Sequence, residues 1–257
     1  MLGAILVPHL QSTAQAATPP SVHVSGNQLV DGGGRPLRLI GVDRSGTEFA
    51  CIQGWGIFDG PSDAASIAAM AAWHINAVRL PLNEDCWLGI NGVSASYGGA
   101  AYRSAVQQYV SLLHAAGLIV VLDLHWTAPG TQPATGQMAM PDADHSPQFW
   151  SSVATTFKSD RGMVFDLFNE PYVSTANAQT SDAWSCWLRG CTVNAGDGAA
   201  GAWQAAGMQT LVNAVRSSGA TEPLMLGGLQ WSNDLSGWLS HEPVSYTHLT
   251  LPTILRV

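Results

Sequence analysis

The tripeptide Asn169-Glu170-Pro171 directly follows a strand-like apolar run at residues 163–168. It places a carboxyl group just past the carboxyl end of a predicted strand, next to an amide that can orient a substrate or another carboxyl group. The proline ends the strand because it has no backbone N–H to donate. In a (β/α)8 barrel the active site lies at this face, so Glu170 could act in acid–base or nucleophilic chemistry. Taken alone, the same tripeptide also fits a surface turn.

Three further segments repeat this pattern, and each is a short apolar run that ends in polar or aromatic residues. They span residues 78–82, 120–126 and 224–231. Apolar runs and helical segments alternate along the chain, which is typical of a parallel α/β sheet. The polar residues that end these runs are therefore expected at one edge of the sheet.

The sequence predicts five strands and four main helices. The expected strands are 37–42, 77–80, 118–124, 163–168 and 223–227, preceded by a hairpin at 22–37 that covers the bottom of the barrel. The expected helices are 63–73, 100–116, 147–157 and 199–218, with a short helical segment at 235–239. Ser62 or Asp63 is expected to cap the first helix, and Gly117 to end the second.

The order and spacing of Arg79, His125 and Asn169-Glu170-Pro171 resemble those of glycoside hydrolase family 5, the cellulase family of retaining barrel enzymes, over about residues 22–243. The resemblance implies an α/β fold of the (β/α)8 TIM-barrel type, with about five βα units present here. It also implies cleavage of O-glycosidic bonds in a β-1,4-linked polysaccharide such as a cellulose-like glucan, without a cofactor. Mannan, xyloglucan and β-1,3/1,6-glucan remain open as substrates.

The resemblance also implies a role for each motif residue. Glu170 is the general acid/base of a double displacement, in which the two carboxyl groups lie about 5–5.5 Å apart. Asn169 binds the sugar 2-hydroxyl, and Arg79 pairs with a carboxylate beneath the site. His125 hydrogen-bonds a sugar hydroxyl or a catalytic carboxyl group. A salt bridge in the barrel floor for Arg79, and a core position for His125, are the structural alternatives.

The nucleophile that the resemblance implies is a Glu at the end of a seventh strand, and the chain has no such strand. We therefore expect this chain to be C-terminally truncated and catalytically inactive. Other carboxylates follow the first three strands, and for these we expect structural or solvated roles: Asp43, Glu48, Glu84, Asp85, Asp123, Asp142 and Asp144. His145 beside two of them could suggest a metal site, but the spacing matches no standard one, and we expect none.

Composition limits the classes of function. Hydrophobic residues make up 46% and charged residues 11% of the 257 positions, which is typical of a globular protein. The net charge is −8 without a Lys/Arg cluster, which argues against nucleic acid as a partner. No run is long enough to span a membrane. We expect a monomer whose partner is a polysaccharide.

The chain contains ten tryptophans, whose flat apolar faces can stack on sugar rings. Trp55, Trp87, Trp126 and Trp231 lie in predicted loops on the active-site face, where sugar stacking and packing are equally good expectations. Three others lie on predicted helices and are expected in the core: Trp73, Trp150 and Trp203.

The four cysteines suit an oxidising compartment and allow three pairings. Cys186 and Cys191 bracket one short loop and are expected to pair with each other. Cys51 and Cys86 would then join the loops after the first two strands.

Both ends of the chain are expected to differ from the catalytic domain. Residues 1–20 contain a short apolar stretch and an Ala-x-Ala pattern, which predict the remnant of a signal peptide and hence secretion. The catalytic domain is expected at 21–243, and residues 244–257 are expected to be a non-native tail. Two other hypotheses stay open, namely a non-catalytic carbohydrate-binding fragment and an artefactual gene fragment.

Overall fold

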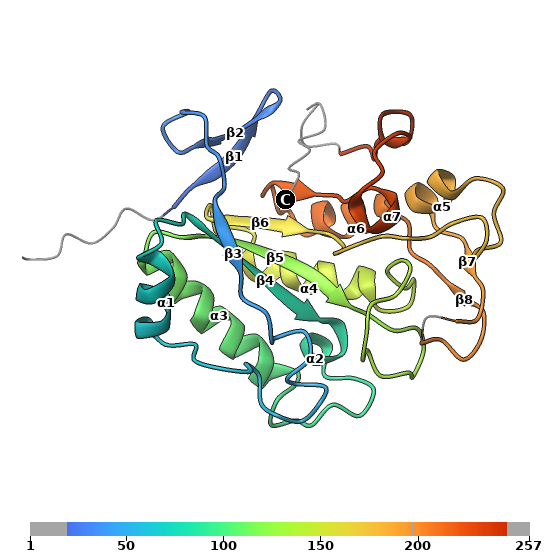
Figure 1. Cartoon of the computed structure of the whole chain (residues 1–257), viewed down its shortest axis with the longest axis horizontal. Helices are drawn as coiled ribbons and strands as arrows, with labels where there is room; N and C mark the ends of the chain where they lie inside the picture. Colours follow the sequence, from blue (N-terminus) through green and yellow to red (C-terminus); the bar gives the residue numbers. More distant parts are fainter. Residues whose placement is uncertain (1–19, 197, 246–257) are drawn as a thin grey trace, which may run out of the picture.

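The computed structural model of the chain describes residues 20–196 and 198–245. Its centre is a parallel sheet of five strands in the order β3-β4-β5-β6-β9 (Figure 1). The strands are β3 (Gly41–Asp43), β4 (Ala77–Asn83), β5 (Ile119–Trp126), β6 (Met163–Asp166) and β9 (Leu224–Met225). Because sheet order follows chain order, each βα unit adds one strand on the same side. The predicted α/β sheet of five parallel strands is confirmed.

Side chains along the central strands alternate between the two faces of the sheet, as strand geometry requires. One set packs against helices in the main core: Val78, Leu80, Leu82, Val120, Leu122, Leu124 and Phe165. The opposite face is apolar near the amino ends of the strands: Ala77, Ile119, Val121 and Val164. Two residues further along, the same face becomes charged, with Arg79, Asp123 and Asp166.

A hairpin of β1 (Val22–Ser25) and β2 (Gln28–Asp31) covers the apolar end of that second face. Its turn uses Gly26 at φ +59°, a conformation that side chains rarely adopt. The backbone N–H of Val22 donates to the Arg161 carbonyl at 2.8 Å, which ties the hairpin to the start of β6. The hairpin predicted at the bottom of the barrel is therefore confirmed.

Eight helical segments connect or flank the strands within the described residues. They are α1 (Ala64–Ala71), α2 (Glu84–Leu88), α3 (Ala100–Ala115), α4 (Ser146–Phe157), α5 (Ala183–Arg189), α6 (Met208–Ser217), α7 (Leu229–Ser232) and the 3-10 helix η1 (Trp238–Ser240). Asp63 caps α1 by accepting the Ser66 N–H at 2.9 Å, as predicted. Asn83 caps α2 by accepting the Cys86 N–H at 3.1 Å. Figure 1 shows α3 running along the sheet beside β4 and β5.

The helix predicted over residues 199–218 is wrong in its first half, because α6 begins only at Met208. The preceding segment forms β8 (Trp203–Gln204), which pairs antiparallel with β7 (Thr192–Val193). Gly207 has no room for a Cβ, which would lie 2.3 Å from the Leu188 carbonyl oxygen. This close approach to α5 keeps the chain extended where alanine content alone favours a helix.

Two of the three tryptophans expected in the core are buried. Trp150 lies in α4, and Trp203 is buried on β8 and not on a helix. Trp73 is 73% exposed, so its predicted core position is wrong. The reason is that α1 ends at Ala71, and Trp73 belongs to the turn that follows.

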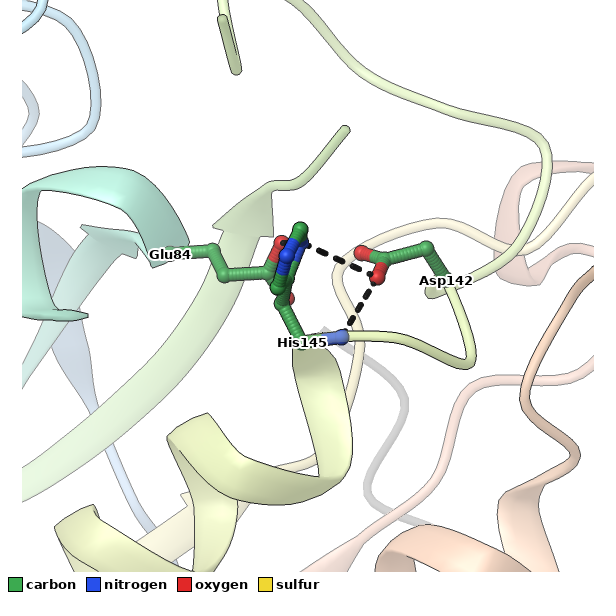
Figure 2. A group of neighbouring side chains, drawn as sticks. All are labelled: Glu84, Asp142 and His145. Atoms are coloured by element: carbon green, nitrogen blue, oxygen red, sulfur yellow. Dashed lines mark hydrogen bonds and ion pairs between the residues drawn. The ribbon is translucent and has the colours of Figure 1, made fainter. Parts of the chain in front are cut away.

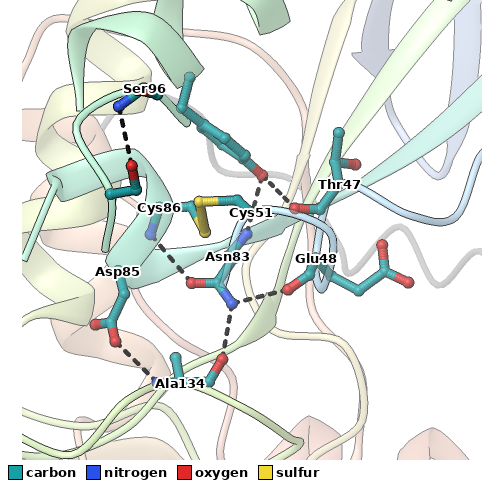
Figure 3. Close-up of a disulfide and its surroundings, with 10 residues drawn as sticks. Thr47, Glu48, Cys51, Asn83, Asp85, Cys86, Ser96 and Ala134 are labelled. Atoms are coloured by element: carbon teal, nitrogen blue, oxygen red, sulfur yellow. Dashed lines mark hydrogen bonds between the residues drawn. A yellow bond between two sulfur atoms is a disulfide. The ribbon is translucent and has the colours of Figure 1, made fainter. Parts of the chain in front are cut away.

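Both predicted disulfides are present. Cys51 pairs with Cys86 across 35 residues and joins the segment after β3 to α2 (Figure 3). Cys186 pairs with Cys191 across the end of α5. Asn83 lies beside the first bridge and donates to the carbonyl oxygens of Glu48 and Ala134, both at 2.8 Å. The loops that follow β3, β4 and β5 are therefore fastened to one another.

The predictions for the two ends of the chain fall almost wholly outside the described residues, which exclude 1–19 and 246–257. The predicted signal-peptide remnant and most of the predicted tail are therefore untested. In the described part of the chain, none of the helices combines the length and apolar character that a bilayer crossing requires.

Candidate active site

Arg79, Asp123 and Asp166 meet on the charged part of the sheet face described above. Asp123 of β5 and Asp166 of β6 are directly paired in the parallel register, so their side chains lie side by side on one face. Arg79 of β4 lies two residues earlier in the register, opposite Val121, and its side chain reaches toward the carboxyl ends of the strands. Asp166 is a site residue that the sequence analysis missed. Its signal was an acid in an otherwise apolar strand, in register with Asp123.

The Arg79 guanidinium is shared by several acceptors. Its Nη2 lies 3.0 Å from both Asp123 Oδ2 and Asp166 Oδ2 and donates to Asn169 Oδ1 at 2.8 Å. Its Nε donates to Asp166 Oδ2 at 3.2 Å. A longer contact of 3.5 Å joins Nη1 to Asp43, whose side chain is 57% exposed. Arg79 thus links four elements of the site in the way that a planar fork of donors permits.

One guanidinium cannot neutralise two buried carboxylates at once. Burial, followed by the nearby charge of Asp123, raises the pKa of Asp166 to about 7 despite its contacts with Arg79. For Arg79, burial opposes the charge, but the surrounding carboxylates outweigh it and raise the pKa further above its usual range. The arrangement therefore retains a proton on Asp166 in mildly acidic solution.

His125 lies next to this cluster, with Nδ1 at 2.5 Å from Asp123 Oδ2. Burial would lower the pKa of His125, but the charge of Asp123 and this hydrogen bond outweigh it, so the pKa is raised. Glu48 is buried nearby, and burial raises the pKa of its carboxyl group too. Asp123 holds the imidazole in one orientation. The predicted hydrogen bond of His125 to a sugar hydroxyl or a catalytic carboxyl group stays a prediction.

The Asn-Glu-Pro motif begins three residues after the end of β6, and Asn169 is fixed from both ends. Its Oδ1 accepts from Arg79, and its Nδ2 donates to Gln137 Oε1 at 3.2 Å. Gln137, from the loop after β5, also donates to the backbone carbonyl of Glu170 at 2.8 Å. The Glu170 side chain is half-buried, and none of the described residues hydrogen-bonds or pairs with its carboxyl group. Gln137 is a second residue that the sequence analysis missed, because nothing in its local sequence marks it.

Aromatic side chains lie at or after the carboxyl ends of β3, β5 and β9. Trp231 is 54% exposed and stacks on Tyr172, with ring centroids 5.1 Å apart and planes at 15°. Trp55, which is 66% exposed, and Trp126, which is half-buried, both contact Phe49, with centroids at 5.6 and 6.3 Å. The sugar-stacking role expected for these three tryptophans stays a prediction.

Trp87 was expected in a loop on this face, and that position is wrong, whereas the alternative of packing holds. It is fully buried in α2, where its indole N–H donates to Ser152 of α4 at 3.0 Å. The helix α2 begins immediately after β4, so Trp87 packs against α3 and α4 and does not reach the surface.

The loop that carries Trp231 includes the short segment α7, whose backbone is strained and is not helical at Gln230 and Trp231. Gln230, Trp231 and Ser232 have φ values of 52°, 55° and 64°, a left-handed region that non-glycine residues occupy at a cost of about 1–3 kcal/mol each. The Trp231 N–H donates to the Pro171 carbonyl at 3.0 Å, and the Ser232 hydroxyl donates to the Asn169 carbonyl at 3.1 Å. Contacts with the Asn-Glu-Pro motif thus hold the loop that presents Trp231.

A second group of acids lies in α2 and in the loop before α4. Glu84, Asp85 and Asp142 are fully buried, and Asp142 is near His145 (Figure 2). Burial and the charge of Asp142 raise the pKa of Glu84 well above its usual value, and burial raises that of Asp85 to about 6. The fully buried positions of these acids agree with the structural roles expected for them, whereas Asp144 is exposed.

A surface hollow of about 1040 Å³ lies elsewhere, at the amino ends of the strands. Its lining includes Asp31, His114 and Asp160 and none of the motif residues. It is therefore separate from the Arg79 cluster.

Comparison with known proteins gives a family match over most of the chain. A family model described as cellulase (glycosyl hydrolase family 5) matches residues 30–251. The chain is 25% identical over 223 residues to the manganese dependent endoglucanase Eg5A of Phanerodontia chrysosporium, covering 85% of this chain and 50% of that protein. It is 24% identical over 151 residues to endoglucanase E-5 of Thermobifida fusca, covering 58% of this chain and 28% of that protein. The chain spans half or less of the length of these relatives.

Solved structures show the same fold. The β-glucanase SdGluc5_26A of Saccharophagus degradans, solved with cellotetraose, superposes with a TM-score of 0.61 at 19% identity, covering 93% of this chain and 62% of that one. The catalytic domain of Thermobifida fusca endoglucanase Cel5A superposes with a TM-score of 0.52 at 19% identity, covering 88% of this chain and 59% of that one. These neighbours are (β/α)8 barrels, so the five-stranded sheet is an incomplete barrel of this type.

Proposed function

The chain belongs to glycosyl hydrolase family 5, the cellulase family, and on this premise we propose that it is part of a retaining glycosidase that cleaves β-1,4-linked glucan. The observation that carries the proposal is Glu170. Its carboxyl group follows the end of β6 and has no partner among the described residues, while the neighbouring Asn169 is locked by Arg79 and Gln137. An acid left free beside a fixed amide suits proton transfer to a bound substrate.

In this proposal Glu170 acts twice. It first donates its proton to the glycosidic oxygen, so that the leaving sugar departs as an alcohol while a second carboxylate attacks the anomeric carbon. The resulting carboxylate of Glu170 then removes a proton from water, and the water oxygen displaces the enzyme carboxylate with net retention. Asn169 would bind the 2-hydroxyl of the sugar at the reacting centre.

The second carboxylate is proposed to be a Glu on a seventh barrel strand, which lies outside these 257 residues. The acids that the site does contain have other partners. Asp123 and Asp166 are fixed by Arg79, and Glu48 accepts the Gly46 N–H at 2.7 Å. We therefore propose that the chain by itself does not turn over substrate. Extracellular action is part of the proposal, and the two disulfides support it.

The test is hydrolysis of cellotetraose by a polypeptide that continues from residue 243 through the remaining strands of its own gene. The proposal predicts products with retained anomeric configuration, and Glu170→Gln should lower kcat by about 10²–10⁴-fold. Glu242→Gln makes the same chemical change at an exposed position and serves as the control. Full activity of Glu170→Gln would refute the proposal.

Non-catalytic binding of a glucan is the second candidate, and the exposed rings of Trp55 and Trp231 favour it. It predicts saturable binding of cellotetraose by the chain alone, without product. Trp231→Ala should weaken that binding, whereas Trp73→Ala, another exposed tryptophan at the other end of the strands, should not. Equal effects of both variants would argue against a specific sugar surface.

A further inference from the structure

Three potential ligand side chains converge outside the Arg79 cluster. Glu84 comes from the first turn of α2, Asp142 from the loop after β5, and His145 from the position just before α4 (Figure 2). Each offers one ligand atom, and these three atoms lie within 4.8 Å of one another. His145 Nδ1 is 3.8 Å from Glu84 Oε1 and 3.6 Å from Asp142 Oδ1, and both distances are too long for hydrogen bonds.

Glu84 supplies an independent sign that a partner is missing. Its side chain is fully buried, and its Oε1 has no hydrogen-bond partner within the described residues. Buried carboxylate oxygens are almost always hydrogen-bonded or bound to a cation. The unpaired oxygen is the one that faces His145.

The hydrogen bonds around the cluster supply few donors for its two carboxyl groups. The Ser146 hydroxyl lies 2.6 Å from Glu84 Oε2 and 3.1 Å from Asp142 Oδ2. A hydroxyl has a single proton, so it can donate to only one of the two carboxylates. In the described parts of the chain, His145 is the only basic side chain within ion-pair distance of either acid. When both carboxyl groups are ionised, they share a single imidazole, and the site lacks a full counter-charge.

We propose that Glu84, Asp142 and His145 bind a divalent transition-metal ion. Two carboxylate oxygens and one imidazole nitrogen are donors that suit Mn²⁺ or Zn²⁺, whereas Ca²⁺ requires six to eight oxygens. Two donors that are each about 2.1 Å from a tetrahedral ion lie about 3.4 Å apart. The observed separations of 3.6 and 3.8 Å need only a small contraction to reach this value.

The surroundings of the three ligands hold them in place. Asp142 Oδ1 accepts the backbone N–H groups of His145 at 2.8 Å and of Asp144 at 3.2 Å. The Ser146 contact fixes the second oxygen of Glu84. Outer contacts of this kind orient ligands and raise their affinity for a metal.

The ion would be structural. It would tie α2 to the loop between β5 and α4, and that loop carries Gln137, which holds Asn169 and the backbone of Glu170. Metal binding would thus stiffen one wall of the candidate active site without contact with the reacting atoms.

The test measures the binding of MnCl₂ to the full chain after treatment with a chelator. Binding is detected as the loss of the electron paramagnetic resonance signal of free Mn²⁺. We expect one Mn²⁺ per chain, displaced by ZnCl₂ and not by CaCl₂. Glu84→Gln keeps the size of the side chain and removes its charge, so affinity should fall at least about tenfold. Asp144→Asn, an exposed acid of the same loop, should bind as wild type.

His145→Ala gives a second variant that should fold even if Glu84→Gln does not. The His145 ring is partly exposed, and its closest polar contact is a long one of 3.4 Å to the Ala128 carbonyl. The affinity of His145→Ala for Mn²⁺ should also fall at least about tenfold. Absence of one-to-one binding by the wild-type chain would overturn the proposal, and so would wild-type affinity in either of these two variants.

Discussion

Asp166→Asn tests whether one guanidinium serves two buried carboxylates. Burial raises the pKa of Asp166 to about 7 in the folded chain, from the ordinary aspartate value of 3.8 that applies to the unfolded chain. Between these values the folded chain holds a proton that the unfolded chain has released, so the free energy of unfolding falls as pH rises. A difference of about three pKa units corresponds to about 4 kcal/mol, lost between about pH 4 and pH 7 and constant above that.

Because asparagine cannot ionise, the free energy of unfolding of the variant should not show this fall between about pH 4 and pH 7. Near pH 4 it should be about as stable as wild type, because a protonated Asp166 and an asparagine both offer Arg79 a neutral acceptor. Toward pH 8 the variant should gain up to about 4 kcal/mol relative to wild type. Urea unfolding followed by tryptophan fluorescence at several pH values measures this difference directly.

Asp43→Asn is the matched control because Asp43 also pairs with Arg79, but at 3.5 Å and with 57% of its side chain exposed. Exposed pairs contribute about 0–1 kcal/mol, so this variant should follow the wild-type pH curve. Parallel curves for Asp166→Asn and wild type would show that Asp166 holds no proton, and the reasoning about the shared guanidinium would then fail.

Three further outcomes follow from the packing and the charges. Replacing Cys51 and Cys86 with serine should lower the free energy of unfolding by about 4 kcal/mol, because the bridge spans 35 residues, and a urea midpoint will measure it. Phe165→Ala removes a fully buried ring and should cost about 3–5 kcal/mol in the same assay, so a loss below 1 kcal/mol would contradict the core assignment. Asp123→Asn should lower the titration midpoint of the His125 imidazole in an NMR pH series, because Asp123 is what raises that pKa, and an unchanged midpoint would contradict this.

The five-stranded sheet could be predicted because its strands are apolar runs of nearly uniform character. A strand buried on both faces reads as a continuous hydrophobic run, and residues 119–122 are such a run. The predicted boundaries of helices and strands were less accurate where tertiary contacts decide them. The extended segment before α6 depends on the fit of Gly207 against α5, which local alanine content cannot reveal.

The candidate site was predictable where a residue lies on a predicted strand or just past its carboxyl end. Asn169 and Glu170 follow such a strand, and Arg79 and His125 lie on or next to one. Gln137 was missed because it comes from the middle of a long loop, and its role depends on contacts with residues 32 and 33 positions away. Glu84 and His145 were judged separately in the sequence, and only the folded chain brings them to 3.8 Å.

The leaving-group dependence of hydrolysis tests the central claim, the acid/base role of Glu170, most directly. The assay compares cellotetraose with a dinitrophenyl cellobioside, whose leaving group departs without a proton, using the polypeptide extended through the remaining barrel strands. The account predicts that Glu170→Ala loses about 10²–10⁴-fold on cellotetraose while still releasing dinitrophenol in a rapid first step. Equal losses on both substrates would contradict the proton-donor role, and activity unchanged on both would remove Glu170 from the mechanism.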